Sequence, residues 1–212
     1  MTRTNVAARL RHELCDLFDA IGPDAPTLCE GWTTRDLAAH LVVRETRPDA
    51  AAGILVQAAA SYGERIRKRT ASRPWPELVD QVRFGPPRFS PMRLSRVDDL
   101  ANTIEFFVHL EDVRRAGTGS HATDVDPAVE ASLVRLLRRG AKLLARRTPV
   151  GLVLSMNGYD EVIAKKGQPS VTLSGSPGEI LLFLYGRSSV SAVEFDGPAD
   201  AIEQLKATKF GI

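Results

Sequence analysis

The chain has 212 residues, of which 43% are hydrophobic and 25% charged, values typical of a globular protein with a buried core. Its 28 basic and 26 acidic residues give a net charge of +2, which does not favour nucleic acid or an anionic membrane as a partner. No apolar segment approaches the roughly 18 residues of a membrane helix, and the start of the chain lacks the apolar stretch of a signal peptide. We therefore expect a cytoplasmic protein that binds neither nucleic acid nor membrane.

The first two-thirds of the sequence predict a series of helices. In the first segment, apolar residues recur at spacings of three and four, which is the periodicity of a helix with one buried face. A Pro-rich segment, residues 84–93, interrupts the series because proline cannot continue a helix. Helices are expected over residues 4–21, from Thr33 onward, and over 49–68, 75–83, 96–116 and 127–147.

The second of these helices has a clear start. Thr33 is followed three residues later by Asp36, which is the spacing of a capping box. This start places His40 about two turns into the helix, on the same side as Leu37 and Leu41.

After Arg147 the composition changes and predicts strands. The dipeptide Asn157-Gly158 is typical of a hairpin turn between two strands. Strands are expected over residues 150–156, 159–164, 170–174 and 190–195, and helices over 178–185 and 199–207. We therefore predict an all-helical domain over residues 1–148 and a small α+β domain over residues 149–212.

Three residues of the helical domain form a candidate metal site. Glu105 and His109 are four apart, so they lie on one face of their helix. That face is largely apolar, and an unpaired carboxylate there would be costly, a cost that a cation would remove. With His40 from another helix they give two imidazoles and one carboxylate, a set that holds a divalent metal and leaves positions open for chemistry.

Each of these residues also has a simpler interpretation. His40 can be a core histidine packed against leucines, and Glu105 with His109 can be a hydrogen-bonded pair on a helix. Two such coincidences within two helices make the metal site the preferred interpretation. The remaining histidines, His12 and His121, are expected on the surface.

The two cysteines and one aspartate are ambiguous. Cys15 and Cys29 match no zinc or redox motif, and burial as small apolar residues is favoured over a disulfide in a reducing compartment. Cys29 nevertheless precedes the second helix closely enough to line a site there. Asp112 lies one turn after His109 and can orient its imidazole, although an ion pair with Arg115 or simple solvation is the favoured interpretation.

Several segments together resemble the mycothiol-dependent maleylpyruvate isomerase family, a branch of the DinB-like metalloproteins. Within that family the chain is similar to an actinobacterial subgroup of metal-binding proteins. The segments are residues 31–41 (GWTTRDLAAHL), 105–116 (EFFVHLEDVRRA), 181–187 (LLFLYGR) and 193–197 (VEFDG). The Pro-rich segment 84–93 and the basic run over 88–96 depart from the isomerase pattern.

The resemblance implies a fold and a metal site. The fold is a DinB-like four-helix bundle with a metal at its core, followed by a small α+β domain of the sterol-carrier-like type. The family's metal ligands fall on His40, Glu105 and His109, and the family's usual metal is zinc.

The resemblance also implies a chemistry in which the metal holds a small thiol, mycothiol, as thiolate. In the isomerases this thiolate adds to a conjugated double bond, the single bond rotates, and the thiol leaves; related members transfer the thiol to an electrophile. A basic residue of the C-terminal domain, here Arg187, is expected to assist catalysis, and Arg88 and Arg93 are candidates for binding a substrate carboxylate. A metal-dependent hydrolase, with metal-bound hydroxide as the nucleophile, and a non-catalytic metal- or ligand-binding stress protein are the alternatives.

Overall fold

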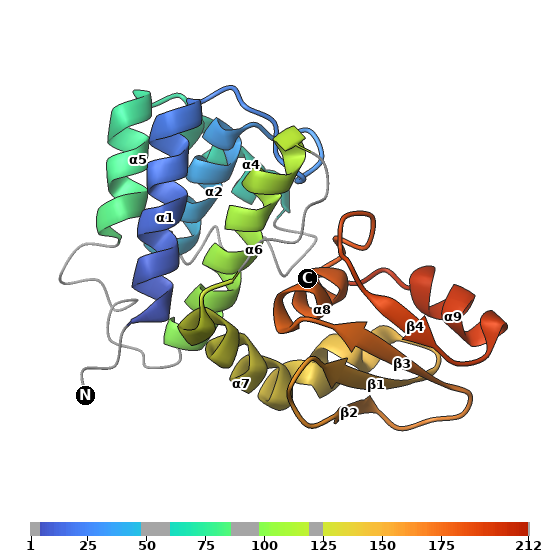
Figure 1. Ribbon diagram of the computed structural model, residues 1–212. Helices are drawn as coiled ribbons and strands as arrows, with labels where there is room; N and C mark the ends of the chain where they lie inside the picture. The colour runs from blue at the N-terminus through green and yellow to red at the C-terminus, as the bar shows by residue number, and fades with distance from the viewer. Residues whose placement is uncertain (1–4, 48–59, 86–97, 119–124, 212) are drawn as a thin grey trace. The chain divides into compact units, whose positions relative to one another are not determined.

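The computed structural model describes residues 5–47, 60–85, 98–118 and 125–211. The chain divides into two compact units, Met1–Thr118 and Gly119–Ile212, which we describe separately (Figure 1). Within the described ranges, no helix is both long and apolar enough to cross a membrane.

In the described residues of the N-terminal unit, all of the named elements are helices. Helix α1 packs against α5 and α6, and α2 packs against α4 and α5. The apolar faces that the periodicity predicts meet in a core that includes the fully buried Phe18, Leu37 and Phe106. The described helices are α1 (Val6–Ile21), α2 (Thr34–Thr46), α4 (Ala60–Ala71), α5 (Trp75–Phe84) and α6 (Asp98–Thr118).

These helices confirm the predicted ones wherever the structure describes them. The first part of the helix expected over residues 49–68 lies outside the described residues, and its last part is α4. Nearly all of the Pro-rich segment 84–93 lies outside them as well, including Arg88 and Arg93.

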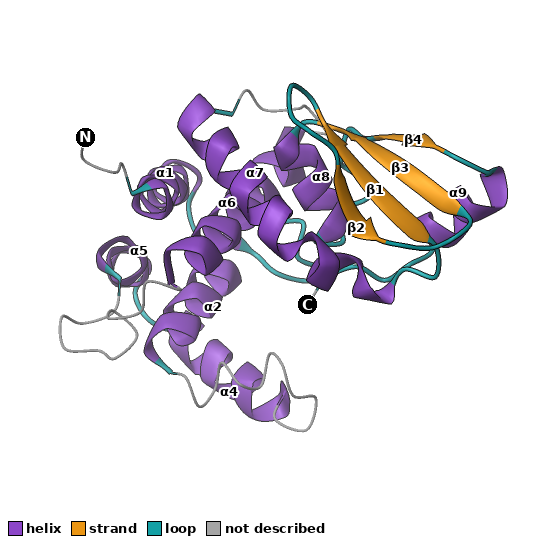
Figure 2. Ribbon diagram, turned by 90° about the horizontal axis from the view of Figure 1, so that it is seen from below, coloured by secondary structure: helices purple, strands orange, loops and turns teal. Residues whose placement is uncertain are grey.

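The C-terminal unit combines a sheet with helices (Figure 2). Its strand order is β2-β1-β3-β4, with β1 parallel to β3 and the two outer strands antiparallel to their neighbours. The predicted turn joins β1 to β2, and Gly158 adopts a φ of 78°, which a residue without a side chain tolerates. The elements are α7 (Pro127–Leu144), β1 (Gly151–Met156), β2 (Val162–Lys165), β3 (Ser170–Gly175), α8 (Pro177–Leu184), β4 (Glu194–Asp196) and α9 (Ala199–Lys206).

Helix α7 belongs to the C-terminal unit, whereas the sequence analysis places the domain boundary after residue 148. The structure makes this division because α7 packs against β2 and α8 and buries Leu133 and Leu137 completely. Strand β4 is also shorter than the strand expected over residues 190–195. It spans Glu194–Asp196, and these three residues pair with β3.

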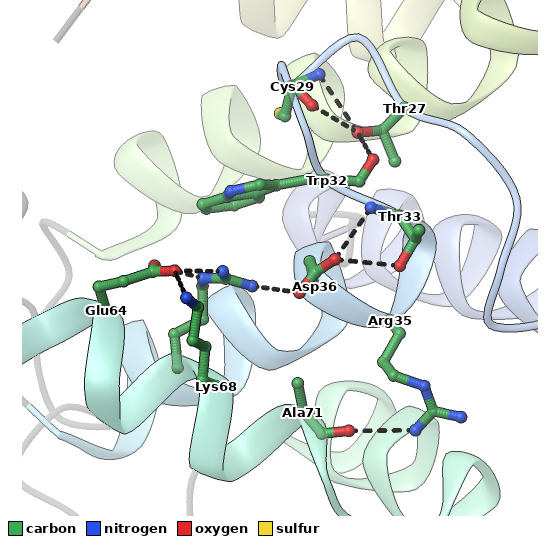
Figure 3. Close-up of polar contacts among 10 residues, drawn as sticks. Thr27, Cys29, Trp32, Thr33, Arg35, Asp36, Glu64, Lys68 and Ala71 are labelled. Carbon is green, nitrogen blue, oxygen red and sulfur yellow. Dashed lines mark hydrogen bonds and ion pairs between the residues drawn. The ribbon is translucent and has the colours of Figure 1, made fainter.

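The capping box predicted at the start of α2 is present (Figure 3). One carboxylate oxygen of Asp36 lies 3.1 Å from the backbone nitrogen of Thr33 and 3.1 Å from its hydroxyl, and accepts from both. The other oxygen pairs with Arg67 of α4. Arg67 also pairs with Glu64 and lies over the Trp32 ring, 4.6 Å from its centroid. The entry into α2 is therefore fixed from its own first turn and from α4.

Candidate metal centre

Helices α2 and α6 bring the three predicted ligands together. His40 Nε2 lies 3.1 Å from Glu105 Oε1, and His109 Nε2 lies 3.3 Å from the same oxygen. One potential ligand atom from each of the three residues lies within 4.8 Å of the other two. On α6 the spacing of four residues stacks Glu105 and His109 on one face, as the sequence predicts.

These separations fit a bound cation as well as hydrogen bonds. Zinc bonds of about 2.0–2.1 Å in a tetrahedral arrangement separate neighbouring donor atoms by roughly 3.3–3.4 Å. The two distances from Glu105 Oε1 to the histidine nitrogens, 3.1 and 3.3 Å, are close to that value. Two of the three donor–donor distances therefore suit a zinc-sized divalent ion, and the third is at most 4.8 Å.

Burial and mutual contacts set the protonation of the site. Burial raises the pKa of Glu105, but hydrogen bonds with His109 and His40 outweigh burial and hold this pKa well below its usual value. For His109, burial opposes the charged form, yet hydrogen bonds with Asp112, Cys29 and Glu105 raise its pKa well above the usual value. Burial lowers the pKa of His40. These shifts favour the ionised form of Glu105, the neutral form of His40 and the protonated form of His109.

Two aromatic rings lie against His40. The Trp32 ring lies 5.2 Å from the imidazole of His40, centroid to centroid, with the planes tilted by 50°. The imidazoles of His40 and His109 meet edge to face at 5.4 Å. The side chains of His40 and Glu105 remain 15% and 22% exposed.

Arg44 is a member of the site that the sequence analysis missed. Its Nε lies 3.4 Å from Glu105 Oε1, and its Nη1 donates a hydrogen bond of 2.6 Å to Asn102 Oδ1. Helical spacing could have identified Arg44 and Asn102 in the sequence, because Arg44 lies one turn after His40 and Asn102 lies one turn before Glu105. A guanidinium beside the candidate metal ligands favours an anionic group of a substrate here.

Asp112 and Cys29 are closer to the site than the favoured interpretations allow. Solvation of Asp112 is wrong, because its side chain is fully buried and its Oδ2 lies 2.9 Å from His109 Nδ1. Cys29 forms no disulfide and is partly exposed, and its thiol lies 3.3 Å from the same Asp112 oxygen. The alternative interpretation, in which Asp112 contacts the imidazole and Cys29 lies beside the site, is the one observed.

The remaining predicted site residues lie in the C-terminal unit or outside the described residues. Arg187 belongs to the C-terminal unit, and its Nη1 donates to the carbonyl of Tyr185 at 2.6 Å. Arg88 and Arg93 lie outside the described residues, as does His121. His12 is exposed on α1, as predicted.

Comparison with known families agrees with the resemblance seen in the sequence. A family model described as the mycothiol maleylpyruvate isomerase N-terminal domain matches residues 5–101. The N-terminal part of this chain is therefore similar to that domain. The matched segment contains His40 and ends just before Glu105 and His109, so the model covers one of the two helices that form the candidate site.

Two solved structures of mycothiol-dependent maleylpyruvate isomerase, one of them a histidine-to-alanine mutant, have a similar fold. Each is 17% identical to this chain and covers 92% of it and 91% of its own length, with TM-scores of 0.60 and 0.61. This likeness confirms the predicted fold class, a DinB-like helical bundle followed by a small α+β domain. No curated protein has a sequence that matches this chain.

Proposed function

We propose that the protein is an enzyme that uses a divalent metal, with zinc the best fit, and mycothiol to isomerise an electrophilic substrate or to transfer the thiol to it. The observation that carries the proposal is the grouping of His40, Glu105 and His109, whose ligand atoms lie within 4.8 Å of one another, with the carboxylate oxygen 3.1 and 3.3 Å from the two imidazole nitrogens. The match of residues 5–101 to the mycothiol maleylpyruvate isomerase N-terminal domain supports the choice of a thiol as cosubstrate.

The side chains of the site are prepared for this role. When bound, the metal would hold a small thiol as its thiolate, which is the nucleophilic form. Glu105 is ionised because hydrogen bonds from the two histidines outweigh its burial and lower its pKa. His40 is neutral at pH 7 because burial lowers its pKa, so its ring can offer a lone pair. His109 must release a proton to do the same.

The charges around the site indicate the kind of substrate. Arg44 lies beside Glu105 and keeps 22% of its side chain exposed, so it can pair with a carboxylate of an incoming electrophile. Arg88 and Arg93 remain candidates for the same role, and Arg187 remains the candidate for a catalytic basic residue of the C-terminal domain. A cytoplasmic location is part of the proposal, since a reducing compartment keeps the thiol cosubstrate and Cys29 reduced.

One assay tests the proposal against its alternatives. Protein purified without added metal is analysed for its metal content, and then offered an unsaturated carboxylate electrophile with and without mycothiol. We expect bound zinc and turnover only when the thiol is present. Removing the metal with a chelator should abolish turnover, and restoring zinc should recover it.

The other outcomes separate the competing functions. Turnover of an ester or amide without any thiol would instead identify a metal-dependent hydrolase. Bound metal without turnover of either kind would favour a non-catalytic metal- or ligand-binding protein. Absence of metal from protein that remains folded would refute the proposed site itself.

A further inference from the structure

A fully buried carboxylate lies on the side of His109 that faces away from the other candidate ligands. Asp112 follows His109 by three residues on α6, so the two side chains lie on one face of that helix. The side chain of Asp112 is 0% exposed, and its Oδ2 lies 2.9 Å from His109 Nδ1. The other ring nitrogen, Nε2, faces Glu105 Oε1. The two nitrogens of His109 therefore have different neighbours, and only Nε2 faces the candidate metal position.

The same carboxylate also accepts a hydrogen bond from the thiol of Cys29, which lies in the loop that precedes α2. The Cys29 sulfur lies 3.3 Å from Asp112 Oδ2, and the backbone nitrogen of Leu28 donates to the Asp112 carbonyl at 3.0 Å. The hydroxyl of Thr27 braces this loop, accepting from the Cys29 nitrogen at 3.2 Å and donating to the Trp32 carbonyl at 2.9 Å (Figure 3). The loop and α6 are thus joined at Asp112 by both a side chain and the backbone.

We propose that Asp112 and Cys29 are positioning residues, which hold the His109 ring with its Nε2 lone pair directed at the metal. Asp112 accepts from Nδ1–H, which fixes the tautomer and the orientation of the ring, and the Cys29 thiol fixes the carboxylate by donating to the same oxygen. This inference rests on the proposed function, because it assumes that His109 is a metal ligand through Nε2.

The same atoms allow one competing arrangement. The ligand atoms of Cys29, His109 and Asp112 also lie within 4.8 Å of one another, so these three residues could bind a metal directly. Burial argues against that arrangement, because Asp112 is fully buried whereas His40 and Glu105 remain partly exposed. A site for chemistry needs an open coordination position that a substrate can reach.

The test compares four variants of the full-length protein for their affinity for Zn²⁺, measured by competition with a chromophoric chelator. Asp112→Asn should weaken zinc binding by about 10–100-fold, the usual effect of removing such a partner. The matched control is Glu111→Gln, which alters the next residue on α6, a carboxylate that is equally buried and pairs with Arg115 and Arg114. This control should lower thermal stability but leave zinc affinity within about twofold of the wild type.

Cysteine variants test the second half of the proposal. Cys29→Ser keeps a donor and should keep near-wild-type zinc affinity, whereas Cys29→Ala should weaken binding about threefold or more. The absorption spectrum of the Co²⁺-loaded protein supplies an independent readout. We expect no sulfur-to-cobalt charge-transfer band in the wild type, and visible bands that change in Asp112→Asn but not in Glu111→Gln.

The outcomes distinguish this inference from the proposed function. If the wild type binds no metal, both are refuted. If the wild type binds zinc and Asp112→Asn binds it equally well, or Asp112→Asn and Glu111→Gln lose affinity alike, only the positioning role is refuted. A charge-transfer band in the wild type that disappears in Cys29→Ala would show that Cys29 is a metal ligand, and would also refute the positioning role. Should Asp112→Asn not fold, the comparison of Cys29→Ala with Cys29→Ser decides the question.

Discussion

Zinc should stabilise the wild-type protein against heat, and His40→Ala should remove most of that stabilisation. A ligand at 100 times its dissociation constant contributes about 2.7 kcal/mol to the free energy of unfolding. For a chain of this size, 1 kcal/mol corresponds to roughly 2–4 °C in Tm, so we expect zinc to raise Tm by about 5–11 °C. The substitution leaves Glu105 and His109, both on α6, as the only candidate ligands of the described site.

The size of the loss follows from the same relation. If loss of the imidazole weakens binding 100-fold, the same zinc concentration equals the dissociation constant of the variant. Zinc then contributes only about 0.4 kcal/mol to the free energy of unfolding, or roughly 1 °C in Tm. His40→Ala also removes the ring that packs against Trp32, which lowers the stability of the metal-free protein. Comparing each variant with and without zinc cancels this packing loss.

Differential scanning calorimetry in a chelator and in buffered zinc measures both quantities. The matched control is His12→Ala, which removes an exposed imidazole on α1 and should keep the full zinc-dependent rise in Tm. Equal rises in the wild type and in His40→Ala would show that the metal binds elsewhere, and the proposed ligand set would then be wrong.

Three further predictions concern residues around the site. Arg44→Gln should raise KM for an anionic electrophile about tenfold but leave KM for a neutral analogue unchanged, in steady-state kinetics. Zinc affinity should fall as pH decreases from 8 to 6, because the raised pKa of His109 makes a proton compete with the metal; binding independent of pH would contradict this assignment. Asp36→Ala should lower the free energy of unfolding at pH 7 by about 1–2 kcal/mol in urea titrations. Burial raises the pKa of Asp36, but hydrogen bonds from Thr33 and Arg67 lower it below 3.8, so the difference should persist at pH 5 and shrink below pH 3.8 as the carboxylate protonates.

The sequence predicts the elements of this fold well because each carries a local signal. The capping box at Thr33 and Asp36 and the Asn157-Gly158 turn both depend on neighbouring residues alone, and both are present. The domain boundary depends on which surface the amphipathic face of α7 covers. That choice is made by tertiary packing, which periodicity does not report.

The candidate site shows the same division between local and tertiary information. Glu105 and His109 are four residues apart on one helix, and His40 lies in the segment 31–41 that resembles the isomerase family. All three could therefore be proposed as candidate ligands from the sequence. The position of Cys29 against Asp112 joins residues 83 apart in the chain, and only the fold reveals it. For Asp112, spacing alone left both its contact with His109 and its solvation open, because helical position does not determine burial.

Each of the three candidate ligands has its own neighbour in the structure. Arg67 lies over Trp32, whose ring lies against His40, and Arg44 contacts the carboxylate of Glu105.

The third ligand, His109, is held by Asp112. These contacts hold Glu105 near the two histidine nitrogens at separations close to those that a metal requires, so we expect little of the binding free energy to be lost to ordering the ligands. If the metal itself brought the ligands together, their side chains would lie apart in the metal-free protein. The metal-free and zinc-bound proteins should therefore differ mainly in the proton on His109.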